Sequence, residues 1–148
     1  MRSLRIASLT FTLGALAGCN SPDSRATTPP KSLDEQVAYG QELFATHCAS
    51  CHGKAGEGGK GPRLVGLTQG ALPLDPPADR TVRKNRFVTA GDVADFVVVN
   101  MPAKKPGSLS SEQYLAILAF DLKANGMNLG HEPLTMAKAR NLVIPVHR

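Results

Sequence analysis

The chain has 148 residues, of which 42% are apolar and 5% aromatic, with 17 Lys and Arg against 12 Asp and Glu. This length supports one small domain, and the composition excludes a collagen, a coiled coil and a multi-span membrane protein. Three cysteines are an odd number, which argues against a simple disulfide framework.

The first 18 residues are predicted to be a signal peptide. Arg2 and Arg5 form a short basic region, and residues 6–16 follow as an uncharged, mostly apolar stretch that is too short to span a bilayer comfortably. Residues 16–19, Leu-Ala-Gly-Cys, resemble the bacterial lipoprotein signal. That resemblance implies cleavage before Cys19 and acylation of Cys19. An ordinary signal peptide with an incidental cysteine is the alternative.

Residues 19–31 are polar and rich in Ser, Thr and Pro, and we interpret them as a lipidated, flexible tether. Cleavage removes two arginines, so the formal net charge falls from +5 to +3. The sequence has no basic stripe interleaved with aromatics, so nucleic acid is not an expected partner. Two or more acyl chains on one cysteine would hold the protein on a membrane. We therefore predict an exported protein anchored to a membrane facing the periplasm, either the inner or the outer one.

The first helix of the folded domain is predicted to begin at Leu33. Ser32 and Glu35 stand at the spacing of a capping box. Apolar or small residues then recur at helical spacing on one face: Leu33, Val37, Gly40 and Phe44. Glycine inside a helix costs about 1 kcal/mol relative to alanine, so Gly40 needs a packing reason.

The strongest motif is the sequence Cys-Ala-Ser-Cys-His at residues 48–52, a C-x-x-C-H pattern that is typical of covalent c-type haem attachment. Two thiols three positions apart on one turn can each form a thioether with one haem vinyl group, and His52 then stands over the iron. A redox-active dithiol would want a βαβ context, and a zinc site would want a second ligand pair. The sequence offers neither, so we predict one haem c per chain, bound by Cys48, Cys51 and His52.

On these residues the chain resembles the single-haem class I cytochromes c, over roughly residues 32–128. The resemblance implies a small all-α fold of about three main helices, with long loops wrapped around one covalent haem. We place this domain at residues 32–130. The resemblance also implies that Gly40 lets the last helix cross the first one closely.

The segment at residues 61–64 matches the same family. There the resemblance implies that the carbonyl of Pro62 accepts a hydrogen bond from the ring N–H of His52, which would fix the ring, and that Leu64 lines the haem. A plain loop turn is the alternative. Residues 65–86 match poorly, and we expect a loop that wraps a haem edge. We expect most of the arginines near this loop to be solvated, with contact to the haem propionates as the alternative: Arg63, Arg80, Arg83 and Arg86. We expect His47 at the surface.

A further helix is predicted after the cap at residues 89–92, and it must end before Pro102. The three valines at 97–99 are also compatible with a strand. Met101 follows this helix, where the resemblance places the sixth ligand of the iron, and methionine raises the potential relative to a second histidine. Met127, a histidine or an open site is the alternative.

The last helix is predicted to start with a capping box at Ser110 and Gln113 and to end at Asn125 and Gly126. Its apolar residues recur at helical spacing: Tyr114, Ile117, Leu118 and Leu122. The resemblance implies that Ile117 and Phe120 pack on the first helix. Residues 131–148 have no clear match, and their role stays open.

These features predict a membrane-tethered electron carrier, not an enzyme with a small-molecule substrate. His52 and Met101 would ligate the iron, and the partner would be a redox protein, either a periplasmic dehydrogenase or an oxidase. Four lysines flank the two ligand segments and are expected to attract an acidic partner, with scattered solubility charge as the alternative: Lys54, Lys60, Lys104 and Lys105. The rival function is a haem-based enzyme or ligand-sensing module with an open sixth iron site.

Overall fold

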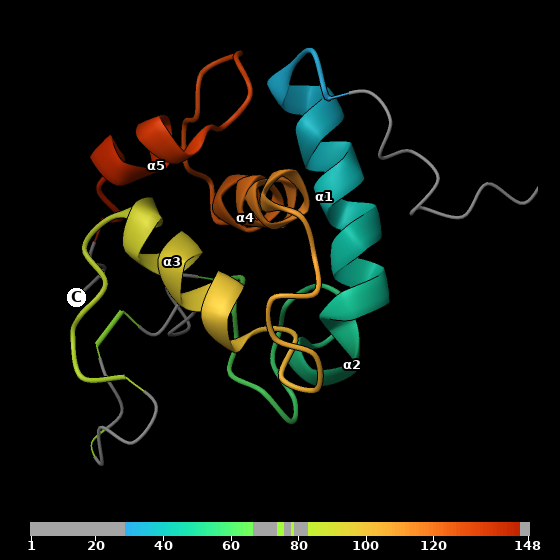
Figure 1. The fold of residues 1–148 in the computed structure, drawn as a ribbon, viewed down its shortest axis with the longest axis vertical. Helices are drawn as coiled ribbons and strands as arrows, with labels where there is room; N and C mark the ends of the chain where they lie inside the picture. Colours follow the sequence, from blue (N-terminus) through green and yellow to red (C-terminus); the bar gives the residue numbers. More distant parts are fainter. Residues whose placement is uncertain (1–28, 67–73, 76–77, 79–82, 146–148) are drawn as a thin grey trace, which may run out of the picture.

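The computed structural model describes residues 29–66, 74, 75, 78 and 83–145. Figure 1 shows the helices within these ranges: α1 (Leu33–His47), α2 (Ala49–His52), α3 (Ala90–Asn100), α4 (Ser111–Ala124) and α5 (Met136–Asn141). The described residues contain no β-strand, and one isolated antiparallel bridge joins Thr89 to Val143. The predicted all-α fold is confirmed, with the short helices α2 and α5 added to three main ones. Within the described ranges, no helix is both long and apolar enough to cross a membrane.

The two longest helices, α1 and α4, meet at Gly40. A Cβ atom at this position would overlap the carbonyl oxygen of Ala116, so only glycine lets the two backbones approach this closely. One turn later, the ring of Phe44 packs against Phe120 with the ring centroids 5.3 Å apart. In the same interface, Ile117 packs against the cluster of Tyr39, Leu43 and Ala116. The expected close crossing of the first and last helices is confirmed.

Side-chain caps explain where the main helices begin. The N-cap hydroxyl accepts a backbone N–H bond in each of four helices: Ser32, Thr89, Ser110 and Thr135. The boxes at α3 and α4 are complete. The predicted box at α1 is half formed, because the Glu35 carboxylate accepts from the backbone N–H of Lys31 at 2.8 Å. The valines at 97–99 are helical, as the cap favours.

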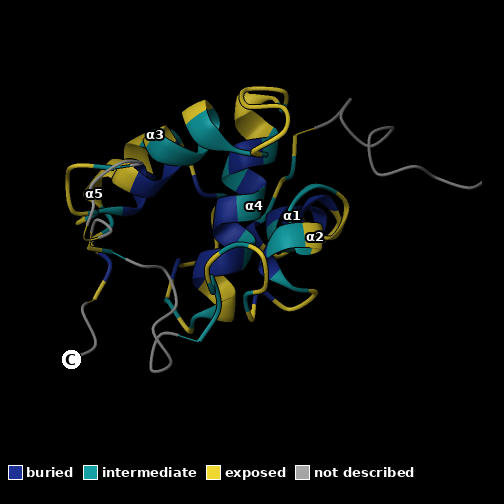
Figure 2. Cartoon of the chain, turned by 90° about the horizontal axis from the view of Figure 1, so that it is seen from below, coloured by how far each residue is buried: buried dark blue, intermediate teal, exposed yellow. Residues whose placement is uncertain are grey.

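Helix α4 lies at the centre of the molecule, between α1 and α3 (Figure 1). Figure 2 shows that much of its surface is buried. The main core cluster joins Leu118 and Leu122 of α4 to Leu33 of α1 and Val93 of α3. Both α1, which leads into the C-x-x-C-H motif, and α3, which leads into Met101, are therefore positioned by the same helix.

The C-terminal segment at residues 129–145 belongs to the folded core. Leu134 and Ile144 are each 2% exposed. The amide of Gln36 in α1 donates to the carbonyl of Leu134 at 3.0 Å and accepts from its N–H at 2.7 Å, while the N–H of Ile144 donates to the carbonyl of Val88 at 2.9 Å. This segment thus joins the start of α1 to the start of α3, at the end of α1 remote from α2 (Figure 1).

Candidate haem site

The C-x-x-C-H residues lie at the junction of α1 and α2. The N–H of Cys48 donates to the carbonyl of Phe44 at 2.8 Å, and the carbonyl of Cys48 accepts from the N–H groups of Cys51 at 3.1 Å and His52 at 3.0 Å. Cys48 therefore ends one helix and starts the next, so one tight turn carries both thiols and the imidazole. Both cysteines are free and half-buried.

The imidazole of His52 is held in one orientation. The side chain is 7% exposed, and its Nδ1 lies 2.8 Å from the carbonyl oxygen of Pro62. Because a carbonyl oxygen only accepts hydrogen bonds, Nδ1 must carry a proton, and in the neutral ring the lone pair then lies on Nε2. The bond joins the two residues that the family resemblance pairs, and it leaves the ring in the tautomer that a metal ligand needs.

The glycine-rich loop after α2 closes on the same ring. Its backbone is tied to the motif by the N–H of Gly61, which donates to the carbonyl of Cys51 at 2.9 Å, and by the N–H of Gly58, which donates to the carbonyl of His52 at 2.7 Å. A Cβ atom on Gly61 would lie 2.8 Å from Cε1 of His52. The sequence analysis assigned a role to Pro62 but none to Gly61. The glycine itself was a signal, because glycine is the residue that lets a backbone approach another group closely.

Asn125 connects this loop to the end of α4. Its Oδ1 accepts from the N–H of Gly66 at 2.8 Å, and its Nδ2 donates to the carbonyls of Leu64 and Asp121, each at 2.8 Å. The sequence predicted Asn125 only as a helix end. The structure adds a second role, because an amide offers a donor and an acceptor and can hold a loop at two points.

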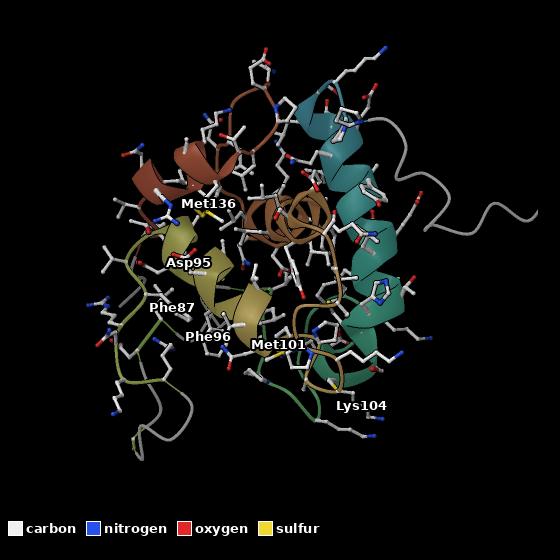
Figure 3. All side chains as sticks on the ribbon, viewed as in Figure 1. Phe87, Asp95, Phe96, Met101, Lys104 and Met136 are labelled. Carbon is white, nitrogen blue, oxygen red and sulfur yellow. The ribbon has the colours of Figure 1, made fainter. Side chains whose placement is uncertain are left out.

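The other predicted site residues have defined places. Met101 follows α3, where its half-buried side chain lies in the lower half of Figure 3, and Leu64 is also half-buried in the loop after α2. The carbonyl of Met101 accepts a hydrogen bond of 2.7 Å from the hydroxyl of Tyr114. The contacts of Met101 and Leu64 with a haem stay predictions. Cys19 lies outside the described residues.

The expectation of a surface position for His47 was wrong. The residue is half-buried, and its Nε2 is covered without a hydrogen-bond partner among the described residues. The physical reason is its register, because His47 lies four residues after the fully buried Leu43 and shares its face of α1.

Arg83 departs from the pattern expected for most of the loop arginines, because it is half-buried. Its guanidinium donates to the carbonyls of Leu74 at 2.7 Å and Asn85 at 2.6 Å and lies 3.7 Å from the centroid of the Phe87 ring. Desolvation lowers its pKa. Unpaired loop carbonyls require donors, and a planar guanidinium satisfies several of them at once. The arginine at position 80 lies outside the described residues.

Two ionisable groups, one in the motif and one on α4, have raised pKa values. Burial, followed by the charges of Asp121 and Cys51, raises the pKa of the Cys48 thiol to about 12, so the free thiol stays protonated near neutral pH. Burial raises the pKa of Asp121 on α4 to about 7, and no hydrogen bond among the described residues reaches its Oδ1. Burial therefore disfavours the charged form of both side chains.

The residues present fit a covalently attached haem. Thioether attachment needs two unpaired thiols on one turn, and iron ligation needs an imidazole nitrogen with a free lone pair. The junction of α1 and α2 supplies all three, in an all-α fold with an apolar interior. The fold and the site therefore define a c-type cytochrome.

Comparison with known proteins assigns the family. The family model described as cytochrome c oxidase, cbb3-type, subunit III matches residues 35–120, which is more than half of the chain. The chain belongs to this family of c-type cytochromes. It is accordingly an electron-transfer protein that carries covalently attached haem c.

Two relatives show how far the similarity extends. The cytochrome bc1 complex cytochrome c subunit of Corynebacterium efficiens is 24% identical over 141 residues, covering 87% of this chain and 47% of that protein. This chain thus spans about half the length of that relative. The crystal structure of the sulfane dehydrogenase SoxCD from Paracoccus pantotrophus contains a chain with a TM-score of 0.54 and 27% identity, covering 92% of this chain and 69% of that one.

Proposed function

We propose that this protein is an extracytoplasmic one-electron carrier, tethered to a membrane through a lipid on Cys19, whose haem iron is ligated by His52 and Met101. The family supports electron transfer, and the signal-like N-terminus supports export. When bound, haem c supplies a one-electron Fe(III)/Fe(II) couple. The chain's own residues attach the group, fix its ligands and exclude water.

The observation that carries the proposal is the bond between Nδ1 of His52 and the carbonyl of Pro62. This bond selects the tautomer and raises the basicity of the ligating nitrogen. The loop that provides the carbonyl is itself fixed by Asn125. An imidazole held this way needs little rearrangement when the charge on its metal changes, which favours electron transfer over ligand exchange.

The ligand assignment can be tested with the three described methionines. Met101, Met127 and Met136 are all half-buried, so Met127→Leu and Met136→Leu are matched controls for Met101→Leu. We expect Met101→Leu alone to lose the long-wavelength charge-transfer band of methionine-ligated ferric haem and to bind carbon monoxide in the reduced form. A wild-type protein that lacks this band and binds carbon monoxide would instead favour the haem-based enzyme or ligand sensor.

The tether can be tested by fractionation. A single substitution, Cys19→Ser, removes the acceptor for lipid, and we expect the haem-containing protein to move from the membrane fraction to the soluble extracytoplasmic fraction with an unchanged visible spectrum. Protein that stays in the membrane fraction after this substitution would show that something other than Cys19 anchors it.

For the partner, we propose a membrane oxidase or a periplasmic dehydrogenase with an acidic docking surface. The support is the family description, which names an oxidase subunit, and the match to a chain of a sulfane dehydrogenase structure.

Lys104 and Lys105 are exposed just after Met101. We expect oxidation of the reduced protein by native membranes to slow as salt rises, and the double variant Lys104→Glu/Lys105→Glu to be slower than the control Lys31→Glu. A rate independent of salt would show that these lysines do not attract the partner electrostatically.

A further inference from the structure

Tyr114 lies where the ends of α3 and α4 meet. It sits in the first turns of α4, is 5% exposed, and its hydroxyl donates a hydrogen bond of 2.7 Å to the backbone carbonyl of Met101. The N–H of Met101 donates to the carbonyl of Val97 at 2.8 Å. The backbone of Met101 is therefore fixed on one side by its own helix and on the other by the central helix.

These two hydrogen bonds matter because the regular helix ends directly before Met101. Helix α3 ends at Asn100, the backbone of Met101 is extended, and residues 103–108 are exposed to solvent. A methionine side chain has three rotatable bonds and adapts readily. Such a side chain holds a metal reliably only when its Cα is held still, and the exposed segment after it cannot do this.

We propose that Tyr114 is a positioning residue for the methionine ligand: through its hydroxyl it holds the Met101 carbonyl and so keeps the thioether on the iron. This inference rests on the proposed function, specifically on ligation by Met101. Tyr114 itself touches the backbone of the ligand residue and does not ligate. Its loss would make the sixth position easier for an external ligand to take.

The chain offers a matched control, because it has only two tyrosines. Tyr39 of α1 is 8% exposed, and its hydroxyl accepts a 3.3 Å hydrogen bond from the side chain of Gln113. Tyr114→Phe and Tyr39→Phe thus remove the same atom from similarly buried rings. Only the first removes a bond to the ligand segment.

The experiment compares the haem-loaded wild type with both variants in three measurements: the methionine charge-transfer band, the affinity of the ferric protein for imidazole, and urea unfolding. An external ligand must first displace methionine, so its apparent affinity rises when methionine is held less firmly. A net hydrogen-bond contribution corresponds to about three- to tenfold in such an equilibrium. We expect that increase in imidazole affinity for Tyr114→Phe and no increase for Tyr39→Phe, with both variants folded.

The outcomes separate the two proposals. If the wild type has the methionine band but Tyr114→Phe binds imidazole no more tightly than Tyr39→Phe, the positioning role is overturned and the ligand assignment stands. If both variants bind imidazole more tightly to the same extent, the effect is general loosening, and the positioning role is again overturned. A wild type without the band overturns ligation by Met101 and this inference with it.

Discussion

Asp121 lies on the buried side of α4 and is 6% exposed. Its backbone carbonyl accepts bonds from Asn125, but Oδ1 has no partner among the described residues. Burial raises the pKa of this carboxyl from 3.8 to about 7, because the charged form loses its hydration. The side chain is therefore a group that the fold tolerates best when it is neutral.

This shift predicts how stability depends on pH. The folded protein holds the Asp121 proton up to about pH 7, whereas the unfolded chain releases it near its ordinary pKa of 3.8. The folded state therefore binds more protons between these values, and stability falls as pH rises through this window. We expect Asp121→Asn, which mimics the neutral form, to raise the free energy of unfolding relative to wild type by an amount that grows from about pH 4 to pH 7 and then levels off. Urea unfolding at several pH values measures it, and a difference independent of pH would contradict it.

Asp92 gives the opposite sign and serves as a control. Asp92 belongs to the capping box of α3, and its carboxylate is exposed. Backbone hydrogen bonds from Thr89 and Val88 lower the pKa of this carboxylate. Its contribution to stability is present above pH 3.8 and is lost as pH falls through its lowered folded pKa. Asp92→Asn should therefore destabilise the protein at neutral pH, and this effect should shrink in acid.

At the scale of elements, the crossing of α1 and α4 depends on a missing side chain. We predict that Gly40→Ala destabilises the protein by about 3 kcal/mol, since the new methyl group would force apart two backbones at Ala116. Thermal or urea unfolding measures this. Gly126→Ala is a useful comparison: a Cβ there meets no atom within 4 Å, so its cost of about 1–2 kcal/mol comes from the positive φ alone. Equal effects for the two variants would contradict the close crossing.

The sequence predicted the helices better than it predicted the hydrogen bonds that join distant segments. Caps and apolar spacing are local signals, and they identified the starts of α1, α3 and α4 and the haem motif. The bonds that Asn125 makes to Leu64 and Gly66 join residues about 60 positions apart. As a polar residue at the end of a helix, Asn125 is already explained as a cap. The spacing of apolar residues gives no information about its distant hydrogen-bond partners. Tyr114 is a similar case. Its ring fits the apolar spacing of the last helix, and that spacing does not predict the hydrogen bond from its hydroxyl to Met101.

At the scale of the whole molecule, the C-terminal segment is a structural part of the domain rather than an appendage. The reason that the sequence left it open is visible in its contacts. Gln36 pairs with Leu134 across 98 residues, and α5, the helix that follows Leu134, has only 6 residues. A short polar helix held by distant partners gives little local signal.

Two neighbouring residues test this conclusion. Ile144 is 2% exposed and packs in the main core, whereas Val143 is 61% exposed. We expect Ile144→Ala to lower the free energy of unfolding by about 2–5 kcal/mol and Val143→Ala to change it by no more than about 0.5 kcal/mol. The visible spectrum of the folded protein should be the same in both, because this segment lies at the end of α1 remote from the motif. A spectral change in Ile144→Ala below its unfolding transition would show that the segment reaches the haem.

The length of α1 sets a geometric relation between anchorage and electron exchange. The helix has 15 residues, so it extends about 22 Å from its first turn to Cys48. A lipid on the proposed tether would therefore attach the molecule at the end of α1 opposite the C-x-x-C-H motif. That arrangement would leave the haem end of the molecule free to turn towards a redox partner beyond the bilayer surface.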